Sequence, residues 1–238
     1  MTVAERVKDF GWYHTMDLGD GVVTPGWFDM RPYIGEYGIP DRLDGKRVLE
    51  VGTWDGFWAF ELERRGAEVV ALDLDDERAL DWPPRRRPAT FSDEPRGQGF
   101  RLAKEILDSK VERVVRSIYH ATPEELGTFD LVFCGSVLIH LRDQFLALER
   151  MAGLSSGQLI LAEEYDRLSS LVPWAVSRFR ANRPKDVVFW LPSRKTWKRM
   201  VWTAGFDRVE EHGRFVMRAG KGEKEFAVRH QVLHGHKQ

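Results

Sequence analysis

The sequence has almost no cysteine, since Cys134 is the only one among its 238 residues. A disulfide framework is therefore excluded, which fits a reducing compartment. No apolar run approaches the roughly 20 residues that a membrane span needs. The charged start, residues 1–9, lacks the apolar stretch of a signal peptide. These absences predict a cytoplasmic protein with no membrane partner.

An excess of charge of one sign is also missing. The chain has 36 Lys and Arg against 37 Asp and Glu, for a net charge of −1, so its overall field does not favour a polyanion. Two local basic clusters remain, Arg85–Arg87 and Arg178–Lys185. We interpret both as solvated loops, with contact to nucleic acid as the alternative. His234 and His236 stand in what reads as a polar, disordered tail, so no metal site is predicted.

The length suits one α/β domain with an added cap or lid. Residues 1–45 carry turn signals around aromatic residues and are predicted to form an N-terminal cap or flap. Residues 46–238 alternate apolar runs with amphipathic stretches, and residues 167–192, mixed aromatic and basic, are predicted to form a lid within them. The expected strands are Arg47–Val51, Glu68–Leu74, Val111–Ile118, Phe129–Cys134, Gln158–Ala162, Val209–Met217 and Phe226–Val232. The expected longer helices are Phe57–Arg65, Phe100–Leu107, Arg142–Leu154 and Ser193–Ala204.

This alternation predicts an α/β fold with a Rossmann-like, seven-stranded sheet, helices on both faces and an antiparallel last pair of strands. The strongest local signal in it is Glu50-Val-Gly-Thr-Trp-Asp-Gly56, where the first strand hands over to a helix. Gly52 and Gly56 let the backbone approach a ligand closely, and the amides of the next helix point at that ligand. Asp73 ends the second strand, where an acid can accept both ribose hydroxyls of a nucleoside.

The type of nucleoside follows from two residues of this turn. Trp54 occupies the second glycine position of the dinucleotide fingerprint, where its bulk would block a pyrophosphate. Glu50, two residues before the first glycine, suits an amino-acid cation. The pattern therefore favours S-adenosylmethionine (SAM) over a dinucleotide, with a purely structural glycine turn as a further alternative.

Glu50–Gly56, Asp73 and Phe129–His140 resemble the motifs of class I SAM-dependent methyltransferases. Further segments are similar to the tRNA wobble-uridine (uridine-5-oxyacetate) methyltransferase-like family, over most of residues 10–215; they are Trp12–Trp27, Phe100–Val111, Leu191–Ser193 and Trp197–Phe206. Ile139 stands where these tRNA enzymes have a Tyr that helps to hold the carboxylate of carboxy-SAM. An Ile cannot donate that hydrogen bond, so ordinary methyl transfer is favoured.

The resemblance also implies the residues that bind the cofactor. They are Glu50, Gly52, Thr53, Trp54, Asp55, Gly56, Asp73, Leu74, Ser117, Ile118, Gly135 and Ser136. Trp27, in the flap over the site, is also expected to contact the cofactor. In this arrangement Leu74 flanks the adenine, and Gly135 and Ser136 lie near the sulfonium. Core packing is the alternative role for Leu74 and Ile118. Tyr13, Arg31 and Trp174 are expected to contact the substrate.

Methyl transfer can depend mainly on positioning, because SAM already carries its leaving group. A hydroxyl acceptor would also benefit from a base, for which His140 is the first candidate and His14, in the flap, the second. The favoured function is methyl transfer from SAM to a small-molecule acceptor, at oxygen. The alternatives are a tRNA wobble-uridine-modifying methyltransferase and a non-catalytic SAM-binding subunit. The oligomeric state is not indicated.

Overall fold

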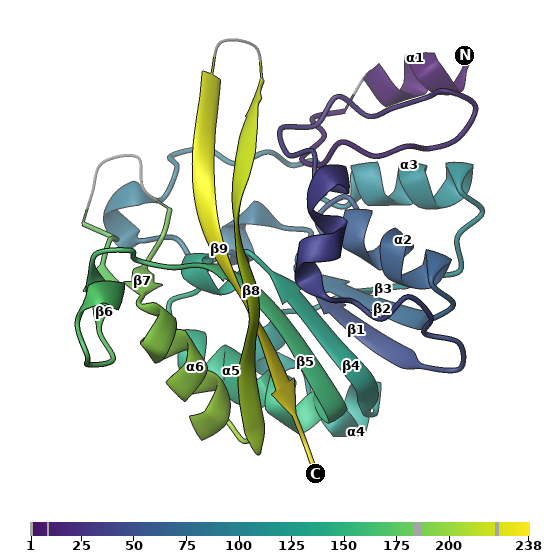
Figure 1. Cartoon of the computed structure of the whole chain (residues 1–238). Helices are drawn as coiled ribbons and strands as arrows, with labels where there is room; N and C mark the ends of the chain where they lie inside the picture. Colours follow the sequence, from purple (N-terminus) through teal and green to yellow (C-terminus); the bar gives the residue numbers. More distant parts are fainter. Residues whose placement is uncertain (1, 9, 183–186, 222–223) are drawn as a thin grey trace.

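A seven-stranded sheet forms the centre of the protein, which a computed structural model describes over residues 2–8, 10–182, 187–221 and 224–238 (Figure 1). Its spatial order is β3-β2-β1-β4-β5-β9-β8. The strands are β1 (Arg47–Val51), β2 (Glu68–Asp73), β3 (Glu112–Val115), β4 (Phe129–Gly135), β5 (Ser155–Glu164), β8 (Arg208–Lys221) and β9 (Lys224–His236). Strands β1 to β5 are parallel, and β9 runs antiparallel to both β5 and β8. The predicted Rossmann-like sheet with an antiparallel last pair is confirmed.

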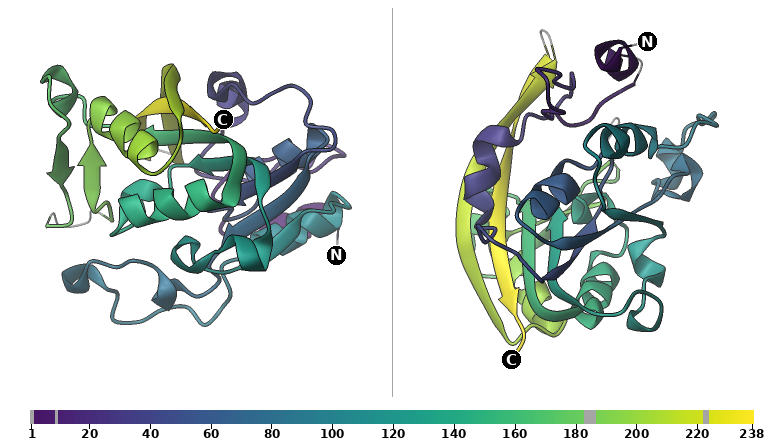
Figure 2. Two further views of the ribbon diagram at one scale, coloured as in Figure 1. Left: turned by 90° about the horizontal axis from the view of Figure 1, so that it is seen from below. Right: turned by 90° about the vertical axis from the view of Figure 1, so that its right-hand side faces the viewer.

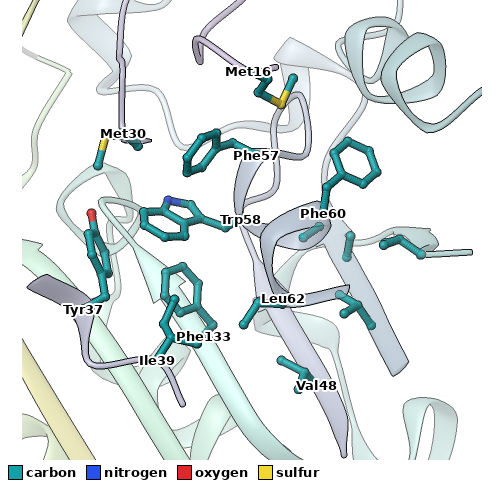
Figure 3. Packing of buried hydrophobic residues seen from close by; sticks show 14 of the residues in the cluster. Met16, Met30, Tyr37, Ile39, Val48, Phe57, Trp58, Phe60, Leu62 and Phe133 are labelled. Carbon is teal, nitrogen blue, oxygen red and sulfur yellow. The ribbon is translucent and has the colours of Figure 1, made fainter. Parts of the chain in front are cut away.

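Helices cover both faces of the sheet (Figure 2). One face carries η1 (Arg31–Tyr37), α2 (Phe57–Arg64) and α3 (Gln98–Ile106), and the other carries α4 (Pro123–Leu126), α5 (Gln144–Leu154) and α6 (Arg194–Thr203). Each face of the sheet has its own apolar core, the first under η1, α2 and α3 and the second under α4, α5 and α6. Because side chains alternate along a strand, Val48 packs in the first core and Leu49 in the second. Tyr37, Trp58 and Phe133 meet at the centre of the first core (Figure 3). Trp58 of helix α2 therefore packs between Tyr37 of η1 and Phe133 of β4, directly after the Gly-containing turn that begins the helix.

The β8–β9 hairpin is longer than the sequence pattern predicts, and it extends beyond the carboxyl end of β5 (Figure 1). The prediction that His234 and His236 lie in a disordered tail is wrong. Both belong to β9, which pairs with β5 and β8 up to His236. The physical reason is that the backbone of β9 pairs with β5 and β8, and this pairing continues the strand although His234 and His236 are polar.

The segment between β5 and α6 contains η6 (Ser169–Leu171) and a small hairpin of β6 (Ser177–Phe179) and β7 (Trp190–Pro192). The Arg178 guanidinium lies 3.0 Å from the buried carboxylate of Asp166, which fixes the base of this hairpin. Part of the predicted basic cluster, residues 183–185, lies outside the described residues. Arg86 Nη2 donates to the Ala181 carbonyl at 3.2 Å, so the two basic segments come into contact.

Three shorter features complete the chain. The N-terminus forms α1 (Val3–Lys8), and the connection between β2 and α3 has single turns at η2 (Glu77–Ala79) and η3 (Pro84–Arg86). The third strand is shorter than predicted, because η4 (Ile118–His120) begins where the Ser117 hydroxyl accepts the Tyr119 amide. Within the described residues, no helix has the length and apolar character to cross a bilayer.

Candidate active site

The turn of residues 52–56, here called the glycine loop, joins β1 to α2. Gly52 has a φ of +85°, and a Cβ at this position would lie 2.3 Å from a methyl carbon of Val137. Glycine is therefore required both by the backbone conformation and by close packing. Val137 follows β4, so the same contact holds the ends of β1 and β4 together.

Asp73 stands at the end of β2 and faces the glycine loop. Its Oδ2 accepts the Trp54 amide and its Oδ1 accepts the Leu74 amide, both at 2.7 Å. Each carboxylate oxygen keeps a second acceptor position, as two ribose hydroxyls require. Arg96, which no sequence motif marks, lies over the Trp54 ring at 4.1 Å from its centroid, and its guanidinium is 3.8 Å from Asp73 Oδ1.

Residues 10–31, here called the strap, are fastened to the glycine loop through Asp55. Oδ2 of this buried carboxylate accepts the amides of Tyr13 and His14, each at 2.8 Å, and its Oδ1 accepts His14 Nδ1 at 2.5 Å. The Tyr13 ring stacks on Trp54 with 4.6 Å between centroids. Burial, Asp55 and Glu163 raise the pKa of Tyr13, so its phenol stays neutral. Tyr13 and His14 thus lie beside the predicted cofactor loop.

Glu163, at the end of β5, is a buried acid that the sequence reasoning did not single out. Its Oε1 accepts the amides of Val137 at 2.9 Å and Leu138 at 2.7 Å. These amides begin the turn η5 (Leu138–His140), so the carboxylate caps it. Burial raises the pKa of Glu163 to about 8, and Oε2 has no hydrogen-bond partner. The available signal was an acidic pair directly after an apolar strand.

Ser136 follows β4 with a φ of +58°, and this strained backbone aims its hydroxyl at β9. Its Oγ lies 2.7 Å from Nε2 of His230, whose ring is fully buried against Phe215. Burial lowers the pKa of His230 to about 4, so the imidazole is neutral near pH 7. No local pattern marks His230, since only the β9–β5 pairing brings it to Ser136.

The other predicted residues occupy different surroundings. His140 Nδ1 lies 3.3 Å from the Val187 carbonyl of the lid. Ile118 is buried, and Trp27 joins the strap to the long hairpin by accepting the Gly220 amide. Arg31 pairs with Asp29 at 2.6 Å, and Trp174 is 67% exposed. The cofactor and substrate roles of these residues stay predictions.

The residues around the glycine loop fit a nucleoside that carries a cationic amino-acid group. Burial raises the pKa of Glu50 to about 8, and its Oε2 has no partner, as for Glu163. Two buried guanidinium nitrogens of Arg96 also lack hydrogen-bond partners, since Nη1 approaches Asp73 Oδ1 only to 3.8 Å. A hollow of about 280 Å³ opens here; it is lined by Phe10, Gly11, Trp12, Trp54, Asp55, Glu94, Pro95, Arg96, Gln98 and Gly99. Unsatisfied buried polar groups of this kind are expected where a ligand completes the site.

Comparison with known proteins places this geometry in a family. Residues 27–211 match the model of a methyltransferase domain, and the chain belongs to that family. A crystal structure of the N-terminal domain of EvdMO1, in the presence of SAH and D-fucose, aligns over 99% of this chain and 96% of that one. Its TM-score is 0.64 at 19% identity, a likeness in fold.

Two curated relatives match over shorter stretches. The ubiquinone biosynthesis O-methyltransferase of Vibrio parahaemolyticus is 28% identical over 114 residues, 48% of this chain. The biotin biosynthesis bifunctional protein BioHC of Cellvibrio japonicus is 40% identical over 50 residues. These matches span 41% and 10% of the relatives' own lengths. With the family established, the predictions of a methyltransferase domain and of a class I methyltransferase fold are confirmed.

Proposed function

We propose that this enzyme transfers the methyl group of SAM to a hydroxyl oxygen of a small molecule. The observation that carries the proposal is the 2.7 Å contact between Ser136 and the buried, neutral His230, at the strand end beside the glycine loop. In this proposal Asp73 binds the ribose, and the carboxyls of Glu50 and Glu163, which burial keeps protonated in the ligand-free protein, ionise when the cationic part of the cofactor binds beside them. SAM supplies a methyl group on a good leaving group.

The chain itself orients the acceptor and receives its proton. Ser136 Oγ donates to His230 Nε2 and presents its lone pairs to the acceptor hydroxyl. A hydroxyl becomes strongly acidic as its oxygen forms a new bond to carbon, so even the weakly basic His230 can take the proton through Ser136. We place the proton acceptor here rather than at His140, which faces the lid, or at His14, which is bound to Asp55.

The acceptor class is supported by what surrounds the site. Tyr13 of the strap packs against Trp54 of the glycine loop and against Phe28, which meets Phe226 of the long hairpin, and aromatic walls suit a small, partly apolar acceptor. The 48% of the chain that matches an O-methyltransferase is consistent with oxygen as the methylated atom. We propose that residues 1–45 act as the cap and residues 167–192 as the lid of this pocket.

A methylation screen tests the proposal. Purified protein with radiolabelled SAM is offered small phenols, sugars and, separately, bulk tRNA, and label is counted in each product. We expect label in a small hydroxyl compound. If label appears in tRNA alone, and if this labelling falls steeply as the salt concentration is raised, the protein is instead an RNA-modifying enzyme. Its RNA would bind the two basic segments that meet where Arg86 donates to the Ala181 carbonyl.

Ser136→Ala tests the relay with the first acceptor that the screen finds. We expect kcat to fall by about 10- to 100-fold, as for loss of acid–base assistance, while the Kd for SAM changes by less than about twofold. Ser156→Ala, an exposed position near the start of β5 at the opposite end of the sheet, is the matched control and should leave kcat unchanged. Equal kcat for Ser136→Ala and wild type would remove the relay from the mechanism.

The two buried acids predict how stability depends on pH. Glu50 and Glu163 have folded-state pKa values near 8, whereas an unperturbed glutamate has a pKa of 4.5, so the folded protein holds more protons than the unfolded chain between these values. The free energy of unfolding of the ligand-free protein should therefore fall as pH rises from about 5 to 8, by up to about 1.4 kcal/mol per pH unit for each group. Urea titrations at four pH values measure this slope.

Glu163→Gln is the matched variant for this measurement. A Gln amide oxygen can still accept the Val137 and Leu138 amides, so the η5 cap is kept while the titration is lost. The variant should show a shallower fall of stability with pH than wild type. An identical slope in wild type, Glu163→Gln and Glu50→Gln would show that neither acid is protonated in the folded state.

A further inference from the structure

A cluster of ligating side chains lies at the opposite end of the sheet from the glycine loop. Glu210 of β8 is the direct cross-strand partner of His234 in β9, and His236 follows two residues later on the same face. His236 also pairs with Gln158, near the start of β5, whereas the glycine loop lies at the strands' carboxyl ends. The cluster is therefore separate from the proposed active site.

The side chains of Glu210, His234 and His236 converge. One ligand atom from each lies within 4.8 Å of the other two, and Glu210 Oε1 is 3.4 Å from His236 Nε2. Ligands at 2.0–2.2 Å from a tetrahedral zinc ion lie roughly 3.3–3.6 Å from one another. One pair already has this separation. The partly exposed side chains of Glu210 and His236 can turn to close the other gaps.

Hydrogen bonding fixes the tautomer of His234. Its Nε2 lies 3.0 Å from the carbonyl oxygen of Tyr37, which can only accept, so Nε2 carries the hydrogen. Nδ1 therefore keeps its lone pair, which meets only a long contact of 3.3 Å from Gln158 Nε2. A histidine that ligates a metal commonly donates its other N–H to a backbone carbonyl in this way.

We propose that Glu210, His234 and His236 bind one Zn²⁺ ion, with water as the fourth ligand. Two imidazoles and one carboxylate suit zinc, whereas Mg²⁺ and Ca²⁺ prefer sites built from oxygen ligands. The ion would connect β8 to β9 and, through the Tyr37 contact, to η1. Its role is to stabilise the sheet edge on which the hairpin and His230 depend, and this proposal does not rest on the methyl acceptor.

His212 lies next to the three proposed ligands and provides a matched control for them. Its ring stacks on His234 with 4.6 Å between centroids, but it lies against Gly38, where a Cβ would come within 2.4 Å of the ring. It packs beside the proposed ligands without belonging to the set that converges. Its removal should lower the zinc affinity by less than about threefold, whereas the loss of a ligand should lower it by about 100-fold or more.

The experiment titrates Zn²⁺ into chelator-treated full-length protein by calorimetry and measures the melting temperature. We expect one saturable site and a rise in Tm of about 5–10 °C at a hundredfold excess over Kd. Co²⁺ should give the visible spectrum of a tetrahedral nitrogen and oxygen site, and Mg²⁺ should give no response. Glu210→Ala and His236→Ala, both at partly exposed positions, should abolish saturable binding while the circular dichroism spectrum stays that of wild type.

Three results would overturn the proposal. The first is no saturable binding of Zn²⁺ below about 1 mM. The second is an unchanged affinity in Glu210→Ala and His236→Ala, which would mean that zinc binds elsewhere. The third is an equal loss in His212→Ala, which would mean that histidine density and not the converging set of ligands attracts the ion.

Discussion

Asp55→Ala is expected to lower the melting temperature by about 10 °C, because one buried carboxylate holds the strap to the glycine loop. The variant loses the bonds to the amides of Tyr13 and His14 and to the His14 ring. Removing one partner of such a buried cluster costs about 3–5 kcal/mol, and 1 kcal/mol moves the Tm of a protein of this size by about 2–4 °C. Differential scanning calorimetry measures the change.

Asp55→Asn is the matched control for this prediction. Its amide oxygen can still accept the two backbone amides, while the bond to His14 has to be rebuilt with the roles of donor and acceptor exchanged. The loss of stability should therefore fall between those of wild type and Asp55→Ala. If Asp55→Ala melts within about 2 °C of wild type, the strap is not held by this residue, and the cap would need another anchor.

Asp73→Ala is expected to weaken SAM binding by at least about 100-fold. In the proposed complex this carboxylate accepts both ribose hydroxyls, and each hydrogen bond to a charged group contributes about 1.5–3 kcal/mol. The variant also leaves the Trp54 and Leu74 amides without their acceptor, which loosens the glycine loop. Calorimetric titration with SAM and with its demethylated product measures both losses.

Asp76→Ala controls for the removal of an acid from the same segment. Asp76 is exposed and caps the turn η2 by accepting the Arg78 amide, so its loss should not change the affinity for SAM. Equal Kd values for Asp73→Ala and wild type would contradict a ribose at the end of β2, and with it the proposed orientation of the cofactor.

The site divides into residues that local sequence could reveal and residues that it could not. Gly52 and Asp73 were recognised because a strand, a turn and a helix within one βαβ unit fix their relative positions. Glu163 has only a weak sequence signal, which is its position as an acid at the end of an apolar run. Arg96 has no recognisable sequence signal, since it stands in an irregular loop and only the folded chain places it over the Trp54 ring. His230 reaches Ser136 from a strand 94 positions away in sequence.

The edge of the sheet shows the same limit for the fold. The expected end of the last strand was Val232, yet β9 continues through the buried Leu233 to His236. Backbone hydrogen bonds to β5 and β8 sustain the strand where its side chains give no apolar signal. That pairing turns three scattered polar residues into the converging set of Glu210, His234 and His236.

Residues close together in the chain were enough to establish the class of fold, the glycine loop with its acid at Asp73, and thereby the adenosyl cofactor. Periodicity and turn chemistry act directly over such short separations, so these features can be read without the folded chain. Three contacts required the folded chain: Asp55 anchors the strap, Ser136 meets His230, and Glu210 of β8 meets His234 and His236 of β9. Each joins distant segments, and the register between them is set by the packing of the whole sheet rather than by any local pattern.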